Sequence, residues 1–154
     1  MEKVIGFNDL EVGKRVKAKG KPGESGTFLA LEIATKTPSD QAEIEGLIQS
    51  INHQQNTLHI LNREIAVPNS IEVKDVNSNS VGFKNLKAGN MVKLKGKYSE
   101  AKGFVVEKIK IKETMGFTIE ELQGNIDKID REKKTLQVVG FTVVVNEKTT
   151  IEWF

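Results

Sequence analysis

The stretch Gly6-Phe7-Asn8-Asp9-Leu10-Glu11-Val12-Gly13 recurs later in the chain as Gly82-Phe83-Lys84-Asn85-Leu86-Lys87-Ala88-Gly89. The recurrence extends beyond these eight positions. Residues 5–33 align without a gap on residues 81–109, with 12 of 29 positions identical, and we name this repeat segment B. Self-similarity of this length indicates one supersecondary plan that is used twice. The Gly-Phe-x-x-Leu-x-x-Gly phrase predicts a short helical turn that ends at a left-handed glycine.

A second repeat, segment A, aligns residues 43–69 with residues 121–147 at 7 of 27 identical positions. Two residues that either alignment superimposes are called matched below. In segment A, Ile44, Gly46 and Ile48 alternate with polar residues, which is the period of a half-buried strand. Because Ile51 and Ile129 break that alternation, we expect a β-bulge in each copy, at Gln49-Ser50 and at Asp127-Lys128.

Each repeat also predicts a hairpin. In segment A, strands 57–61 and 64–67, with their matched strands 135–139 and 142–145, are expected to be joined by two-residue turns at Asn62-Arg63 and Gly140-Phe141. In segment B, lysines alternate with apolar residues over 15–21 and 91–97, and a turn then leads to strands 27–33 and 103–112. All of these elements are strands, so the sequence predicts an all-β protein.

Segment A followed by segment B gives a three-strand meander, a helical turn and a two-strand hairpin. This is the strand count and order of the oligonucleotide/oligosaccharide-binding (OB) barrel. We therefore expect two OB-like five-stranded β-barrels related by internal duplication. Residues 42–113 would form a contiguous barrel, and residues 1–36 plus 120–154 would form a second, circularly permuted one from the chain ends. A sequential arrangement, with residues 1–75 as one barrel and residues 76–154 as the other, also fits the repeats.

Composition limits the class of protein. The 154 residues are 38% hydrophobic and 29% charged, with a net charge of +2 and no cysteine. These values are typical of a globular protein and exclude disulfides and thiolate chemistry. No apolar run approaches the ~20 residues that cross a bilayer, and the first ten residues lack a signal-peptide pattern. We expect no membrane span, and a monomer or weak homo-oligomer.

Several motifs resemble a known family. Glu43-Ile44-Glu45-Gly46, then the phrase from Phe83 to Gly89, then Val92-Lys93-Leu94-Lys95-Gly96, resemble a bacterial domain of unknown function, number 5666 in its series. The resemblance implies an OB-like barrel, often in tandem, with no assigned activity. It also implies an exported location, periplasmic or at the cell surface. A looser similarity to the OB-type haem chaperone of cytochrome c maturation lacks that family's histidine, so no cofactor is expected.

Chemical signatures of catalysis are weak in this sequence. His53 and His59 stand apart from any second metal ligand, and we interpret both as exposed polar residues. Carboxylates such as Glu43, Glu45 and Glu107 have lysine neighbours, which suits cross-strand ion pairs better than acid/base work. The chain is therefore expected to be no enzyme, with no catalytic, cofactor or metal residues.

Lysines give the one functional candidate. Residues 84–112 hold nine lysines against Glu100 and Glu107. A polyanion-binding strip is predicted at Lys93, Lys95, Lys97, Lys108 and Lys110, with Tyr98, Phe104 and an exposed Phe141 as stacking surfaces. Alternating lysines are equally typical of the solvated face of a strand or a protected sheet edge. We expect a non-enzymatic binding or scaffolding module that interacts with proteins in the bacterial envelope. The alternative is a single-stranded nucleic-acid or anionic-glycan binder.

Overall fold

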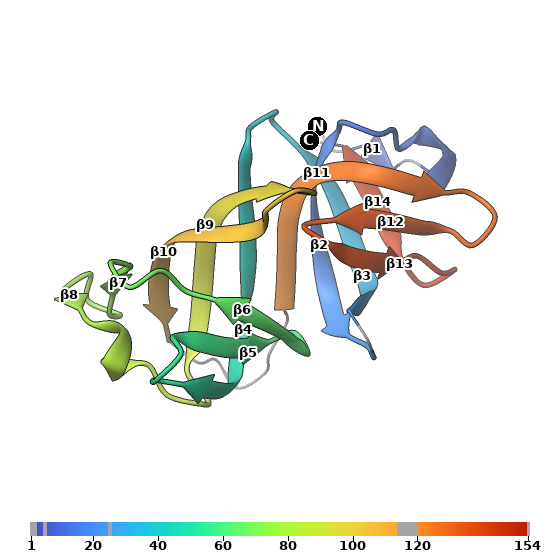
Figure 1. Cartoon of the computed structure of the whole chain (residues 1–154). Helices are drawn as coiled ribbons and strands as arrows, with labels where there is room; N and C mark the ends of the chain where they lie inside the picture. The colour runs from blue at the N-terminus through green and yellow to red at the C-terminus, as the bar shows by residue number, and fades with distance from the viewer. Residues whose placement is uncertain (1–2, 5, 25, 114–119, 154) are drawn as a thin grey trace.

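The computed structural model describes residues 3–4, 6–24, 26–113 and 120–153, which form fourteen strands and two single 3-10 turns (Figure 1). The N-terminal part contains β1 (Lys3–Val4), η1 (Phe7–Asp9), β2 (Arg15–Pro22) and β3 (Thr27–Lys36). The middle contains β4 (Gln41–Asn52), β5 (Thr57–Ile60), β6 (Arg63–Ala66), β7 (Glu72–Lys74), β8 (Ser80–Val81), η2 (Phe83–Asn85), β9 (Met91–Ser99) and β10 (Gly103–Lys112). The C-terminal part contains β11 (Glu120–Asp130), β12 (Thr135–Val138), β13 (Phe141–Val144) and β14 (Thr150–Trp153). The fold is all-β, as the sequence predicted.

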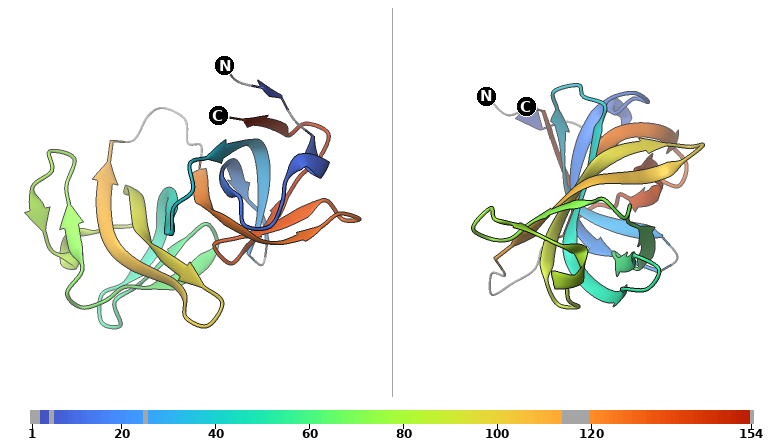
Figure 2. Two further views of the ribbon diagram at one scale, coloured as in Figure 1. Left: turned by 90° about the horizontal axis from the view of Figure 1, so that it is seen from above. Right: turned by 60° about the vertical axis from the view of Figure 1, so that its left-hand side comes forward.

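Five strands close a barrel that uses both ends of the chain. Antiparallel ladders join β11 to β12, β12 to β13, β2 to β3 and β2 to β11. The barrel closes where β13 runs parallel to β3, with Val143 opposite Phe28. Farther along β3, β14 pairs with its second half, and β1 then pairs with β14. The two ends of the chain consequently lie side by side (Figure 2).

The remaining strands form a second group beside the closed barrel. β4 pairs with β5 and β9, β5 with β6, and β9 with β10. β7 runs parallel to β10 over Lys108, Ile109 and Lys110, and β8 pairs with β7. The strands that would complete a ring, β6 and β10, are not paired with each other. This middle group therefore has an open seam, whereas the first group has none.

An antiparallel ladder between β4 and β11 joins the two groups. Ile44 lies opposite Leu122, with Glu45 opposite Glu121 and Glu43 opposite Gln123. Ile44 and Leu122 are matched residues, so two residues that the alignment superimposes lie opposite each other across the junction. β4 also pairs with β9, and β11 also pairs with β2. One sheet therefore runs without interruption from β3 through β2, β11, β4 and β9 to β10.

Bulges occur where the sequence predicted them. The register shifts between Ile48 and Ser50 in β4, and between Ile126 and Lys128 in β11. A second register shift occurs in each group of strands. It lies between Lys19 and Gly20 in the β2–β3 ladder and between Val106 and Lys108 in the β9–β10 ladder. There Gly20 and Gly96 are required, because a Cβ at either position would overlap the carbonyl oxygen of Leu29 or Val105. These extra residues bend long strands around a small core.

The hairpin tips lie one residue earlier than predicted. The turn residues are Leu61-Asn62 and Val139-Gly140, and all four have positive φ, between 52° and 77°. Asparagine and glycine thus occupy the second turn position, where left-handed backbone suits them. Leu61 and Val139 accept the same conformation because both are buried, against Gly46 and Gly124 respectively. Packing against a strand glycine overrides the local turn preference that the sequence indicated.

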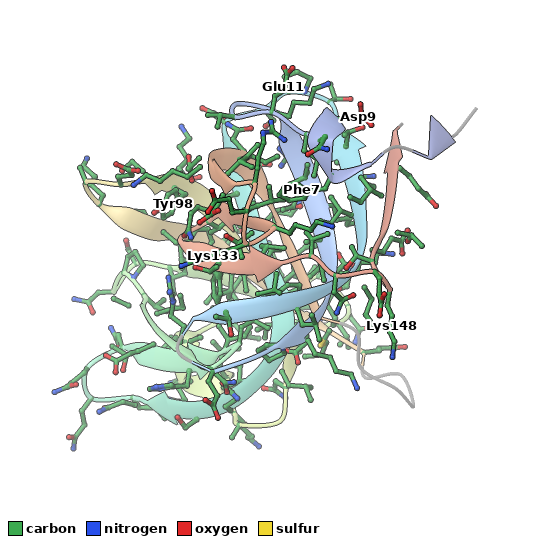
Figure 3. The ribbon with its side chains drawn as sticks, turned by 90° about the vertical axis from the view of Figure 1, so that its right-hand side faces the viewer. Phe7, Asp9, Glu11, Tyr98, Lys133 and Lys148 are labelled. Atoms are coloured by element: carbon green, nitrogen blue, oxygen red, sulfur yellow. The ribbon has the colours of Figure 1, made fainter. Side chains whose placement is uncertain are left out.

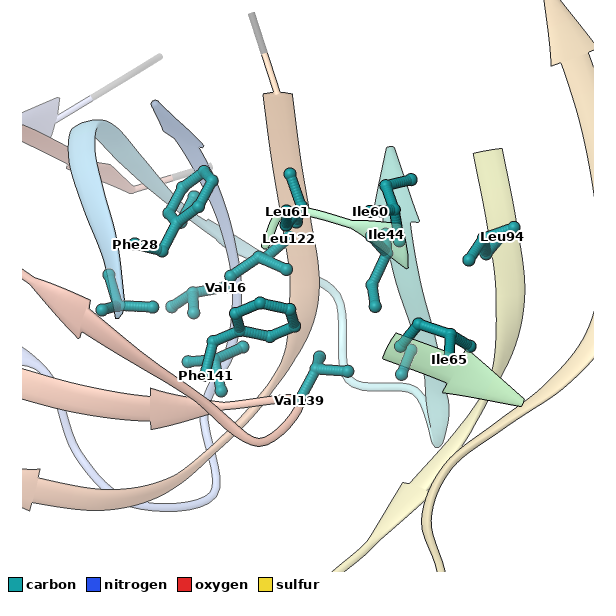
Figure 4. Packing of buried hydrophobic residues seen from close by; sticks show 14 of the residues in the cluster. Val16, Phe28, Ile44, Ile60, Leu61, Ile65, Leu94, Leu122, Val139 and Phe141 are labelled. Carbon is teal, nitrogen blue, oxygen red and sulfur yellow. The ribbon is translucent and has the colours of Figure 1, made fainter. Parts of the chain in front are cut away.

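The core is continuous through both groups. Phe28, Val16 and Phe141 lie within the closed barrel, while Ile44, Leu61 and Leu122 connect it with the middle group, and Ile65 and Leu94 lie beyond (Figure 4). The η1 turn covers one end of the closed barrel with Phe7 and Leu10, whereas the neighbouring Asp9 and Glu11 lie outside (Figure 3). Gly13 and Gly89 leave these turns with φ of 95° and 93°, as predicted. Phe141 is fully buried, so its predicted exposure was wrong.

Candidate functional site

The predicted lysines lie together on the outer side of β9 and β10. Strand alternation turns Val92 and Leu94 into the core and Lys93, Lys95 and Lys97 outward. On β10 the same alternation turns Lys108 and Lys110 outward. The register places Lys95 opposite Lys108 and Lys93 opposite Lys110. Like charges directly opposite each other destabilise a sheet unless neighbouring carboxylates compensate them.

The lysines of β9 have carboxylate partners on the neighbouring strand. Lys93 Nζ lies 3.9 Å from Glu45 Oε1, and Lys95 Nζ lies 3.7 Å from Glu43 Oε1. Lys97 Nζ lies 3.5 Å from Asp40 Oδ2 at the exposed end of the strip. These pairs are partly open to solvent, and each contributes only about 0.2 to 1 kcal/mol.

The lysines of β10 have no carboxylate in ion-pair contact in the described part of the chain. Lys110 donates from Nζ to Ser78 Oγ at 2.8 Å, and Lys108 has no polar partner among the described residues. Beside them, β7 adds Lys74, which pairs with Glu72 at 3.2 Å. A groove runs over this face between the side chains of β7, β9 and β10. We name Lys93, Lys95, Lys108, Lys110 and Lys74 the lysine face.

The matched face of the closed barrel carries different charges. There Lys17 and Lys19 of β2 lie opposite Ala34 and Glu32 of β3. Lys17 and Lys19 also approach one carboxylate, Glu121, at 3.6 and 3.8 Å. The positions of Ala34 and Glu32 are those that Lys110 and Lys108 occupy in the middle group. Opposed lysines are thus a property of one group of strands and not of this type of strand pair.

The predicted aromatic residues do not lie on the lysine face. Tyr98 and Phe104 are opposite each other in the β9–β10 register, on the side of the strands that faces inward. Burial is the largest cause that raises the pKa of the Tyr98 hydroxyl, and the nearby carboxylates of Asp127 and Glu100 raise it further. The structure therefore groups four of the five predicted lysines, leaves Lys97 at the end of the strip, and separates all five from both rings.

A polar network beside the lysine face was not predicted from the sequence. Arg15 is 8% exposed and donates from Nη2 to the Gln41 carbonyl at 2.9 Å. With its side-chain amide turned to satisfy both neighbours, Gln123 accepts from Arg15 Nη1 and donates to Glu43 Oε2 at 2.9 Å. The network links β2 through β11 to β4, and so to Lys95. Arg15 stands in the lysine-rich pattern of β2, and only the strand register reveals its burial.

Other titratable groups include the two histidines and a few partly buried carboxylates. His53 and His59 are exposed, and the His53 ring meets Phe83 edge-on at 5.6 Å. Burial raises the pKa values of Glu120 and Asp127. Asp127 borders a small recess with Asp40, Gln41 and Asn125, where β4 and β11 diverge. In the described ranges, no three His, Cys, Asp or Glu side chains are grouped as metal ligands.

These observations define the class: a small all-β protein with a closed five-stranded barrel, further strands and a lysine-rich outer sheet face. The chain belongs to the family described as a domain of unknown function, DUF5666, whose model matches residues 2–34 and 45–110. The family resemblance noted in the sequence is thereby confirmed. Neither a search of curated proteins nor a search of solved structures found a match. Within the described residues, no helix has the length and apolarity to span a membrane.

Proposed function

We propose that this chain is a non-enzymatic binding module that holds an anionic glycan on the lysine face. The observation that carries this proposal is the opposition of Lys95 to Lys108 and of Lys93 to Lys110. Two further features support it: Lys108 has no polar partner among the described residues, and the matched strands place Glu32 and Ala34 at the corresponding positions. A ligand with several negative charges would supply the anionic partner that Lys108 and Lys110 lack among the described residues.

The spacing of the ammonium groups suits a linear ligand. Alternate residues of one strand are roughly 7 Å apart and neighbouring strands about 4.8 Å apart, so the four opposed lysines form a small rectangular array. A chain with one charge per repeating unit can lie along it. Single-stranded nucleic acid is the weaker candidate, because its sequence-independent binding relies on aromatic stacking. Tyr98 and Phe104 lie on the other side of the strands.

We infer that the frame of this module consists of two related OB-like units, residues 42–113 and residues 1–36 plus 120–154. The matched bulges, the matched hairpin tips and the meeting of Ile44 with Leu122 support this origin. A scaffolding role that binds a protein partner in the bacterial envelope is the second candidate function. The open seam of the middle group favours it.

The test of the glycan proposal uses a charge reversal that copies the matched strand. Lys108→Glu reproduces the pairing of Glu32 with Lys19, and Lys133→Glu changes the net charge equally in an exposed turn at the far end of β11. Fluorescent polygalacturonate is titrated with each protein at ~50 mM and ~200 mM salt, and binding should fall steeply with salt. Lys108→Glu should lose about tenfold in affinity, whereas Lys133→Glu should retain most of it.

Stability measurements separate a binding role from a structural one. Lys108→Glu replaces a like-charge pair with an ion pair, and should therefore raise the free energy of unfolding by about 0.2 to 1 kcal/mol. We therefore expect Lys108→Glu to bind polygalacturonate more weakly than the unaltered protein and to be more stable than it. Equal loss of affinity in both variants, or no binding at ~50 mM salt, would contradict the proposal. Preferential binding of a fluorescent oligothymidylate would favour nucleic acid instead.

A further inference from the structure

The open seam lies between β6 and the first half of β10. In the closed barrel, the matched strands β13 and β3 pair over three residues, and the Thr142 amide donates to the Gly26 carbonyl at 3.0 Å. In the middle group, β6 pairs only with β5; it lies near β10 but forms no ladder with it. β10 pairs with β9 along its length and with β7 only from Lys108 onward. Residues 103–106 of β10 therefore have a strand partner on one side only.

Strand alternation identifies the backbone groups that face the seam. Ile60 and Arg63 flank the two-residue turn and form the closing pair of the hairpin. In an antiparallel ladder the next residue, Glu64, and then Ala66 point their N–H and C=O groups away from the partner strand. Thr142 and Val144 are the matched residues, and they face β3. Phe104, matched to Phe28, presents its backbone to the same seam.

The opening has a cause in one side chain. Phe141 of β13 is fully buried in the closed barrel, but its matched residue in β6 is Arg63. A guanidinium group is too costly to bury in an apolar barrel. Arg63 instead reaches across the junction, donates from Nη1 to the Gly140 carbonyl at 2.7 Å and lies over the Phe141 ring. The start of β6 is thus held toward the other barrel.

The side chains next to the seam remain partly uncovered. Phe28 is fully buried beneath β13, whereas its match Phe104 is only half-buried. No atom lies within 4 Å of the Cβ position of Gly103. An unpaired edge flanked by apolar side chains is the surface to which extended peptides add as strands.

We propose that the first half of β10 accepts an extended, uncharged segment of a protein partner as an added strand, parallel to β10. The occupant follows from the closed barrel, where β13 (Phe141–Val144) covers the matched edge with β-branched residues. The proposal rests on the relationship between the two units and is independent of the lysine face. The partner segment is expected to be short and rich in valine, threonine or isoleucine.

The test uses the full chain and a peptide with the sequence of residues 140–146, extended by one lysine at each end for solubility. In the free protein, amide exchange should be fast at Glu64, Ala66 and Phe104 and slow at Phe28, Thr142 and Val144. Adding the peptide should slow exchange at Phe104 at least tenfold. The same peptide N-methylated at the positions of Thr142 and Val144 should have no effect, because it lacks the required donors.

Other outcomes overturn the proposal. Slow exchange at Glu64, Ala66 and Phe104 in the free protein would mean that β6 already closes the seam. Equal effects of the methylated and unmethylated peptides would indicate apolar contact without strand addition. Protection of Phe104 that rises with protein concentration alone would make a second copy the occupant. Finally, Arg63→Phe should close the seam, protect Glu64 and Ala66, and abolish the response to the peptide.

Discussion

The guanidinium carbon of Arg63 lies 4.4 Å from the centroid of the Phe141 ring, and the two residues occupy the same position of segment A. Phe141 therefore fills the closed barrel, whereas its matched residue Arg63 contacts that barrel from β6. The pair lies between the two groups of strands, as Ile44 and Leu122 do. The Arg63–Phe141 contact thus adds to the junction that the β4–β11 ladder forms.

Truncation of Arg63 should weaken the junction. Arg63→Ala removes the contact with Phe141 and the hydrogen bond to Gly140, and the free energy of unfolding should fall by about 1 to 3 kcal/mol. Urea denaturation measures the change. Glu64→Ala, at the exposed neighbouring position, is the control and should change stability by less than about 0.5 kcal/mol. Equal effects at both positions would exclude a role of Arg63 in the junction.

Gly124 should tolerate no side chain, because Val139 occupies the space above it. A Cβ at Gly124 would lie 2.8 Å from Val139 Cγ2, and Val139 is held in a turn with φ of 52°. Gly124→Ala should therefore cost about 1 to 3 kcal/mol through overpacking. The double variant Gly124→Ala/Val139→Ala should be less destabilised than the sum of its single variants. Gly82→Ala is the control, since its nearest neighbour would be 3.8 Å away.

Glu120 should make stability depend on pH. Burial raises the pKa of its carboxyl, and a hydrogen bond with the Leu47 backbone opposes part of that rise. Because the folded-state pKa exceeds the unfolded one, the folded protein binds the proton more tightly. Its stabilising contribution is present below the unfolded pKa and is lost as pH rises through the folded pKa.

Glu120→Gln keeps an acceptor for Leu47 and removes the ionisation. The variant should match the natural chain near pH 4 and exceed its stability near pH 7, as measured by urea midpoints at both values. Glu64→Gln controls for the loss of one negative charge at an exposed site. A variant that is less stable than the natural chain at pH 7 would show that the charged carboxylate stabilises the fold.

Removal of residues 121–154 should affect the two groups of strands differently. β2 and β3 lose β11 and β13, their partners in the closed barrel, whereas the ladders among β4, β5, β6, β9 and β10 remain. Amide exchange of the truncated chain should show fast exchange in residues 15–36 and retained protection in β4, β9 and β10. Protected amides throughout residues 15–36 would instead favour a barrel formed from residues 1–75 alone.

The sequence predicted the features that depend on near neighbours in the chain. The alternation of Ile44, Gly46 and Ile48, the break at Ile51 and the Gly-Phe-x-x-Leu-x-x-Gly phrase each correspond to a strand, a bulge or a turn in the structure. These patterns are reliable because side chains of a strand alternate sides every residue. The lysine strip was predictable for the same reason, since Lys93 and Lys95 share one side of β9.

The outcome at Phe141 illustrates what local patterns omit. The sequence predicted that Phe141 lies in the turn and is exposed, yet the turn lies one residue earlier, where Val139 packs against Gly124. That shift turns Phe141 inward and makes it fully buried. Which residues form the tip of a tight hairpin depends on the residue that packs beneath the tip. Here that residue is Gly124, which lies on another strand.

The sequence by itself determined the ten strands of segments A and B, the bulges in segment A and most inward-facing residues, because these follow from the two-residue period of extended chain. It did not predict β1, β7, β8 and β14. Only the tertiary structure decided that strands from both ends of the chain share one barrel, that Lys95 faces Lys108, and that β6 and β10 stay unpaired. Each of these depends on the register between segments far apart in the chain. Register is set where side chains from both segments compete for the same space, and no single segment contains that information.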